Sequence, residues 1–401
     1  MDFRNVNPLN IRTNLISGNL LPLEPGDSRF SIGWKLFAVL MWLVQVIQVI
    51  VLIPGFFVVS REKALVDGTM NAVLSIEVFF NIGWIHAHRK LVDQLIQQVN
   101  NILCNEDEMM KSIVMSTLQP IKAPLRFYWV VGGLCVLLWS CIPLPLIFKK
   151  VSFRYEDYRM PAVFSKQPFS LSIFLMGSIF MIIGNTYVFL KKGGMDIYMI
   201  HFVLLITAQY RYIATKLTAI FRNAILQSDL EQCRPDQWVN KEIKALCRHY
   251  TSVLRLSSLL KQLLSLSFSM IYVNSVLRFC FIGVMLSTVN NTINTNHPRN
   301  IPSTTFLEGF LIFIYTCGSI VQFYVLCFCM QQLQDASKNM TNEAFHENWY
   351  RFGSSIKRTL MLMILGTNLD CKISTNDKLN LSLTSFMSIL NQSYSILLVL
   401  L

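Results

Sequence analysis

Long apolar stretches, separated by polar segments, follow one another along almost the whole chain. A helix needs about 20 mostly apolar residues to cross a bilayer, and seven stretches of the sequence meet this requirement. The pattern therefore predicts an all-α protein built as a seven-transmembrane-helix bundle. The predicted spans lie at about 33–59, 66–87, 127–148, 168–190, 263–288, 304–329 and 382–401.

One apolar stretch, at 195–208, is short and contains Asp196 and His201, directly after Lys191 and Lys192. We interpret it as the inward continuation of the fourth helix, buried against protein. As a separate span it would bring the number of crossings to eight.

Two further segments, 204–262 and 330–370, carry apolar residues at the three-to-four spacing of helices, with charges between them. This pattern fits membrane helices that simply extend beyond the bilayer. It fits equally well a helical cytoplasmic anchor region in which subunits meet.

Composition supports the membrane class, because 53% of the 401 residues are hydrophobic and only 14% are charged. Soluble domains carry about 25% charged residues. The net charge of +12 could indicate a nucleic-acid partner, but no basic run is interleaved with aromatics and no Gly-rich phosphate loop is present. Nucleic-acid binding is therefore excluded, and the basic residues are expected to mark cytoplasmic loops.

The distribution of Lys and Arg predicts a cytoplasmic N-terminus and, after seven crossings, an extracellular C-terminus. Segment 1–32 has no apolar core of signal-peptide length, so the first span is expected to act as the insertion signal. The sequon at Asn290 then lies outside and is a predicted glycosylation site, whereas the sequon at Asn339 lies inside. A cytoplasmic N-terminus also argues against a G-protein-coupled receptor.

Polar side chains of the last helix fall on one arc of about 120° at helical spacing. Such a face suits a pore, where water and cations meet hydroxyl and amide groups. The alternative is that these groups hydrogen-bond a neighbouring helix. The predicted pore-lining residues are Ser385, Ser388, Asn391, Gln392, Ser395 and Val399, which ends the stripe.

Three charges fall inside predicted spans: Glu77, Arg278 and Glu308. Charges are costly in lipid and usually face protein or water. We expect Arg278 and Glu308 to pair because their depths are similar. The alternative is a role in the vestibule or the ligand site, and Asp196 is expected to order the inner end of the fourth helix.

The stretch CMQQLQDASKNMTNEAFHENWY (329–350) follows the sixth predicted span, and Asp196 and Gln209 lie on the fourth helix and its continuation. The stretch is similar to the segment that follows the sixth span of insect odorant receptors, and the two residues keep that family's separation. The loop between helices four and five is short, which resembles an odorant-specific tuning subunit and not the co-receptor. The family is usually apolar at Lys191 and Lys192. The last helix matches the family at Phe386, Ile389, Leu390, Ser393, Tyr394 and Ser395.

The resemblance implies an odorant-gated, non-selective cation channel in the plasma membrane of olfactory sensory neuron dendrites. Its implied partners are the family co-receptor in a heterotetramer, a small volatile ligand and membrane lipid. It implies a cytoplasmic segment at 1–32, a pocket-bearing bundle at 33–329, anchor helices at 330–370 and a pore helix at 371–401. The alternatives are a metabotropic seven-helix chemoreceptor, a gustatory-receptor-like channel and a multi-span transporter.

An odorant pocket is expected to be apolar, with aromatic and Met side chains in the outer and middle parts of the spans. We expect no enzyme activity, cofactor or metal, because no catalytic set or metal-ligand spacing is evident. The candidate pocket residues are Ile76, Phe79, Phe80, Trp139, Ile142, Phe174, Met176, Phe180, Met181, Phe310, Phe313 and Ile314.

Overall fold

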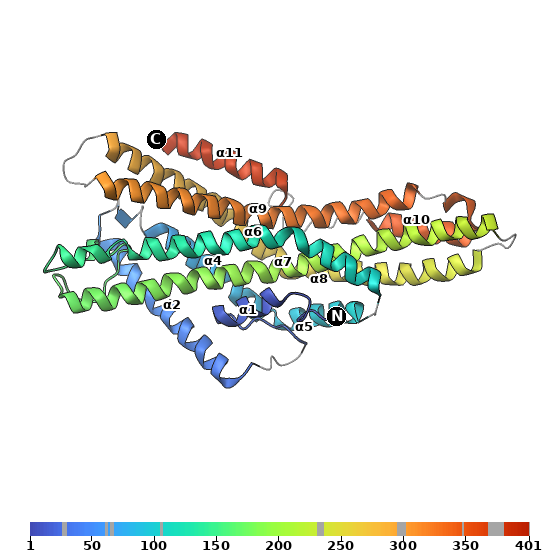
Figure 1. The fold of residues 1–401 in the computed structure, drawn as a ribbon, viewed down its shortest axis with the longest axis horizontal. Coiled ribbons are helices and arrows are strands. Elements are labelled where there is room, and N and C mark those ends of the chain that lie inside the picture. Colours follow the sequence, from blue (N-terminus) through green and yellow to red (C-terminus); the bar gives the residue numbers. More distant parts are fainter. Residues whose placement is uncertain are drawn as a thin grey trace.

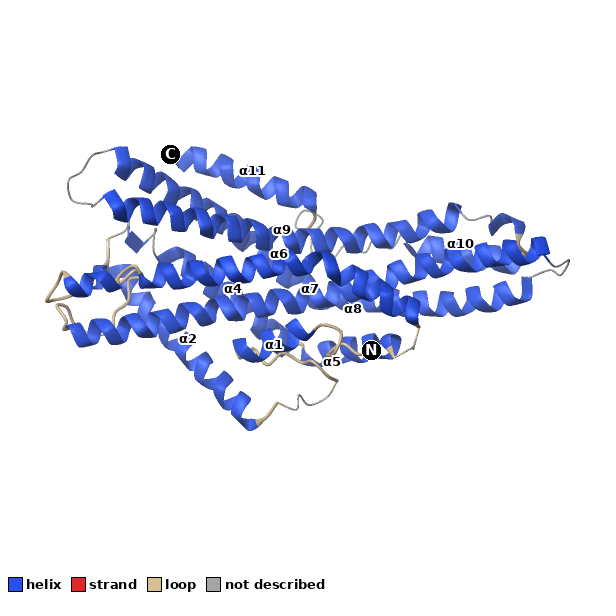
Figure 2. Ribbon diagram, in the orientation of Figure 1, coloured by secondary structure: helices blue, strands red, loops and turns tan. Residues whose placement is uncertain are grey.

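The protein is an elongated bundle of helices, with the longest ones running along its long axis (Figure 1). The structure, a computed structural model, describes residues 1–25, 30–60, 63–64, 68–104, 107–230, 236–294, 302–346, 349–367 and 381–400. Among these residues there are helices and loops but no strand (Figure 2). This confirms the predicted all-α class.

Each predicted span corresponds to a helix. Five of these helices (α2, α6, α7, α8 and α9) are long and apolar enough to cross a membrane on length and composition alone. The other two, α4 and α11, are shorter. Helix α4 also carries buried polar residues, such as Asn71 and Glu77. The helices are α2 Ile32–Val58, α4 Thr69–Ala87, α6 Glu108–Cys141, α7 Leu171–Leu230, α8 Asp236–Asn294, α9 Pro302–His346 and α11 Leu383–Leu400.

The longest helix, α7, has 60 residues and at 1.5 Å per residue extends about 90 Å, three times the hydrocarbon thickness of a bilayer. It is continuous through 195–208, which confirms that this stretch continues the fourth helix. The same continuity places Asp196 in mid-helix, so the expectation that it orders a helix end was wrong.

Two shorter helices, α5 Arg89–Leu103 and α10 Ser354–Thr367, pack against α8 (Figure 1). In α5, Val92, Leu95, Ile96 and Val99 are buried, the spacing of one helix face. The Tyr212 hydroxyl donates to Asp107 Oδ2 at 2.6 Å, and this hydrogen bond lowers the pKa of the Asp107 carboxyl.

The N-terminal segment folds into the core. Helix α1, Pro8–Ser17, packs against α7, and the Phe3 ring stacks on Phe202 with 4.5 Å between centroids. The Phe3 carbonyl oxygen lies 3.0 Å from His201 Nε2. This contact could not be predicted from the sequence, because one aromatic residue among polar ones gives no periodic signal.

The loop between α6 and α7 builds a second apolar core with α2. It contains the 3₁₀ helices η2 Leu144–Phe148 and η3 Tyr155–Asp157. The rings of Phe153 and Phe174 stack at 4.2 Å, and Tyr158 packs against both Phe169 and Phe174. This loop therefore covers one end of the bundle as a packed cap.

Candidate functional site

A cavity of about 120 Å³ lies among α4, α6, α7, α8 and α9. It is smaller than the roughly 300–1,000 Å³ sites that hold drug-sized ligands, so it suits a small molecule. Residues distant in sequence form its mostly apolar wall. These are Met70, Leu74, Val136, Trp139, Val188, Phe189, Met285, Ile312, Ile314 and Tyr315, with Met160 contributed by the loop that caps the bundle.

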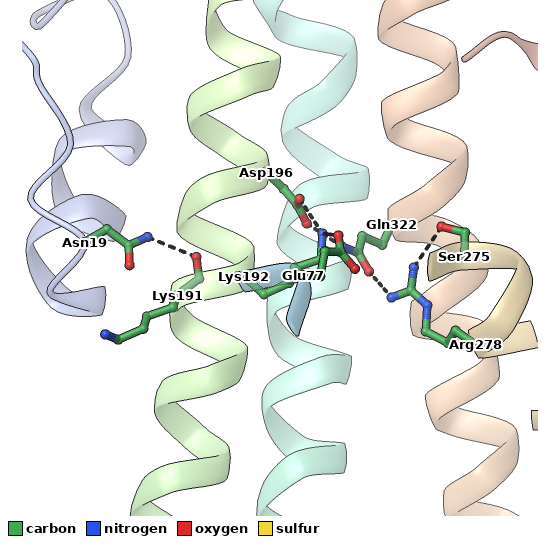
Figure 3. Close-up of polar contacts among 8 residues, drawn as sticks. All are labelled: Asn19, Glu77, Lys191, Lys192, Asp196, Ser275, Arg278 and Gln322. Atoms are coloured by element: carbon green, nitrogen blue, oxygen red, sulfur yellow. Dashed lines mark hydrogen bonds and ion pairs between the residues drawn. The ribbon is translucent and has the colours of Figure 1, made fainter. Parts of the chain in front are cut away.

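The inner part of the cavity meets a buried charge cluster centred on Lys192. Its Nζ atom lies 2.7 Å from Glu77 Oε1 on α4 and 2.6 Å from Asp196 Oδ1 one turn along α7. All three side chains are at most 3% exposed. Figure 3 shows them converging between the helices. A buried cation with two carboxylates leaves one negative charge to be balanced.

Arg278 on α8 supplies that balance through Gln322 on α9. Arg278 Nη1 donates to Gln322 Oε1 at 2.8 Å, and Gln322 Nε2 donates to Asp196 (Figure 3). Arg278 Nη2 donates to Ser275 Oγ at 3.3 Å. The cluster thus joins four helices and holds two positive and two negative groups.

The predicted Arg278–Glu308 pair does not form, so that prediction was wrong. Glu308 Oε1 instead accepts from Arg159 Nη1 at 2.8 Å, and Arg159 also lies over the Trp139 ring at 4.2 Å. The capping loop folds back over the bundle and brings Arg159 to Glu308. Similar depth along two helices did not reveal this competing partner.

Lys191 and Lys192 are adjacent but have different surroundings, because successive helix residues point about 100° apart. The Lys191 side chain is fully buried, and its Nζ lies 3.4 Å from the centroid of the Trp42 ring on α2. The Lys191 carbonyl accepts a 3.0 Å hydrogen bond from Asn19. The N-terminal segment is therefore hydrogen-bonded to α7 one residue before Lys192 of the charge cluster.

A second buried polar chain joins α2, α7 and α6. Gln48 Nε2 donates to Asn185 Oδ1 at 2.7 Å, and Asn185 Nδ2 donates to Ser140 Oγ at 3.1 Å. Both Asn185 and Ser140 line the cavity. These amide and hydroxyl groups satisfy one another, so they fix helix positions more than they offer free donors.

Helix α11 buries one face and leaves the other open. Phe386 and Ile389 are buried, with the Phe386 ring 5.7 Å from those of Phe323 and Tyr324 on α9. Ser393, the polar residue outside the predicted arc, is also buried. The opposite face forms an open groove lined by the polar residues Thr384, Ser388, Asn391, Gln392 and Ser395 together with Met387.

Comparison with known proteins agrees with this arrangement. The family model described as 7tm Odorant receptor matches residues 63–394. The chain belongs to the 7tm odorant receptor family. This membership, together with the long apolar helices, indicates a multi-pass membrane protein. The family is one of receptors and not of enzymes.

Two Drosophila melanogaster odorant receptors are similar to parts of the chain. Odorant receptor 85f is 25% identical over 91 residues, which are 23% of each protein. Odorant receptor 67a is 21% identical over 154 residues, which are 38% of this chain and 34% of the relative. These matches thus span about a quarter to a third of the curated relatives.

The fold is that of a solved insect olfactory receptor. The structure of olfactory receptor OR5 from Machilis hrabei aligns with a TM-score of 0.78 and 12% identity, over 98% of this chain and 96% of that one. The structure of the same receptor in complex with eugenol aligns with a TM-score of 0.77, also at 12% identity, over 98% of this chain and 97% of that one. At this identity the likeness shows the fold alone.

Within this odorant receptor, the candidate pocket residues fall into three groups. Trp139 and Ile314 line the cavity. Phe79, Phe80, Phe174, Phe180 and Met181 pack within the bundle or its cap, where Phe79 faces Trp42 and Phe80 stacks on Trp84, and Ile142 is half-buried. The third group is about half or more exposed on the surface of the chain: Ile76, Met176, Phe310 and Phe313.

Most of the cavity wall could not be predicted from the sequence. Asn71, Tyr128, Phe189, Met285 and Tyr315 line it, yet their residue types occur throughout the spans. One signal was available: Lys192, a charge in an otherwise apolar stretch, marks the polar side of the cavity.

Predicted pore residues Ser388, Asn391, Gln392 and Ser395 lie on the open groove of α11. Ser385 is half-buried and hydrogen-bonds Ser382. The side chains of Val399 and Asn290 lie outside the described residues. Within the part of the chain that the structure describes, no group of three His, Cys, Asp or Glu side chains is arranged to hold a metal ion.

Proposed function

We propose that this receptor is the tuning subunit of an odorant-gated, non-selective cation channel. The observation that carries the proposal is the division of α11 into a packed apolar face and an open polar one. An exposed row of hydroxyl and amide groups is costly against lipid. It is favourable where it faces water and ions in a pore shared between subunits.

The odorant site in this proposal is the cavity beside the Lys192 cluster. The cavity is small, mostly apolar and walled by five helices. Binding there would act on helices α8 and α9, against which α11 packs. The structural likeness to a receptor solved in complex with eugenol supports a small volatile ligand.

The partner in this proposal is the family co-receptor, in a heterotetramer held together at the cytoplasmic end. Helix α10 supports such contacts, because it exposes the apolar side chains Met361, Leu362 and Leu365. Surface patches of this kind mark interaction sites. In the plasma membrane, the N-terminus would lie inside and the end of α11 outside.

Co-expression of the chain with a co-receptor tests the proposal. We expect odour-evoked cation currents that persist when intracellular nucleotides are removed, because gating needs no second messenger. The matched control is the co-receptor expressed alone. A response that disappears with the nucleotides would favour a metabotropic receptor, and surface-expressed heteromers silent to a broad volatile panel would contradict the proposal.

A further inference from the structure

The polar side of the cavity contains two buried donors that lack acceptors. Arg278 is 3% exposed, and both of its terminal nitrogens donate to protein groups, but its Nε–H has no hydrogen-bond partner among the described residues. Asn71 on α4 is 4% exposed, and its Nδ2 also lacks a partner there. Both residues line the cavity.

Buried donors without acceptors are costly, and nearly all such groups in folded proteins find a partner. A ligand can supply the missing acceptor. Most of the remaining wall, including Met70, Leu74 and Phe189, offers apolar contact, and the Asn185 amide and Ser140 hydroxyl on it already bond each other. The complement of this site is a small molecule with an apolar body and one oxygen acceptor.

The charge of the ligand follows from the cluster beneath. Lys192 and Arg278 balance Glu77 and Asp196. A carboxylate ligand would leave one uncompensated negative charge in the interior of the bundle, where such a charge is expensive. A neutral carbonyl keeps the balance and still accepts a hydrogen bond from the guanidinium.

We infer that this cavity selects neutral odorants carrying a carbonyl oxygen, held by Arg278 Nε–H with Asn71 Nδ2 as the second donor. The inference rests on the proposed function for its biological setting, but ligand binding can be measured without channel activity. The two donors determine the chemical class of the ligand, and the apolar wall determines only the size of the ligand.

The test uses matched pairs of ligands on the purified full-length chain in detergent. Each pair is a methyl ketone of six to ten carbons and the alkene in which a methylene replaces the oxygen, for example 2-octanone and 2-methyl-1-octene. Ligand-induced increases in the unfolding temperature report binding. We expect at least one ketone to bind about tenfold tighter than its alkene, and octanoate to bind more weakly than 2-octanone.

Three variants assign the donor. Arg278→Lys keeps the charge for Gln322 and Ser275 but has no Nε–H, so the preference for the ketone should be lost. Asn71→Leu should reduce it. Thr186→Val is the control: it removes a hydroxyl that bonds the Ile182 carbonyl within α7 and does not line the cavity, so the preference should stay unchanged.

Ketones that bind no better than alkenes anywhere in the series, or a preference that survives both Arg278→Lys and Asn71→Leu, would overturn the inference. Tighter binding of octanoate would overturn the neutral class. If Arg278→Lys does not fold, the ketone–alkene comparison on the wild-type chain and on Asn71→Leu still tests the inference. Binding without current would instead count against the channel proposal alone.

Discussion

Lys192 Nζ lies 2.7 Å from Glu77 Oε1, and this contact joins α7 to α4 inside the bundle. Asp196, one turn along α7 from Lys192, places its Oδ1 atom 2.6 Å from the same Nζ atom. The three groups are almost fully buried, so each depends on the others for compensation of its charge.

Removing the lysine should therefore be severe. Lys192→Met leaves two buried carboxylates beside each other, and we expect a loss of about 3–5 kcal/mol in the free energy of unfolding. Thermal unfolding of the purified protein in detergent measures this loss. Adding Glu77→Gln should restore part of it, since one carboxylate is then removed.

Lys191→Met is the matched control. Lys191 is equally buried, but its ammonium group faces the Trp42 ring and no carboxylate. Met fills similar space without a charge, so stability should change by only about 1 kcal/mol, the size of a cation–π contact. Equal losses for the two lysines would contradict the assigned cluster.

The open face of α11 should be accessible to water-soluble thiol reagents. Asn391→Cys, made in a background without the exposed Cys104 and Cys141, should lose most of its odour-evoked current after a charged methanethiosulfonate is applied to the heteromer. The reagent then sits in the ion path. Current recordings before and after modification provide the measurement.

Ser393→Cys is the control for that experiment, because Ser393 lies on the packed face of the same helix and is buried. Its current should be insensitive to the reagent. If Asn391→Cys is equally insensitive, or if both positions react alike, the polar face does not line the pore.

Cavity size should respond to Gly132. A Cβ at this position would lie 2.5 Å from Phe189 Cε2, and both residues line the cavity. Gly132→Ala should push the ring and raise the half-maximal odorant concentration about tenfold. Gly83→Ala, where a Cβ meets nothing within 4 Å, should leave the dose–response curve unchanged; a shift there and not in Gly132→Ala would refute the assignment.

Topology can be tested through the sequons at Asn290 and Asn339. If the N-terminus is inside, Asn290 is exposed to the glycosylation machinery and Asn339 is not. Asn290→Gln should abolish the mobility shift on glycosidase treatment, and Asn339→Gln should preserve it. The reverse result would invert the predicted orientation.

The sequence was informative wherever one helix determines the outcome. Length and hydropathy predicted the spans, and the helical period predicted the polar arc of α11, because both properties depend on residues close along the chain. Continuity of α7 through 195–208 could also be predicted, since no Pro occurs between 171 and 208.

Contacts between helices could not be predicted in the same way. The Arg278–Glu308 pair was expected from depth alone, and neither the return of Arg159 from the cap nor the bridge through Gln322 has a local signal. Phe3 enters the core from a polar segment for the same reason.

The sequence by itself thus determined that this protein is a membrane-spanning helical bundle with a polar final helix. Only the tertiary structure decided which charges meet, where the cavity lies and which donors face it. The physical reason is that a helix fixes the faces of its own residues, whereas contacts between helices depend on their relative rotation and displacement, which packing of the whole chain sets.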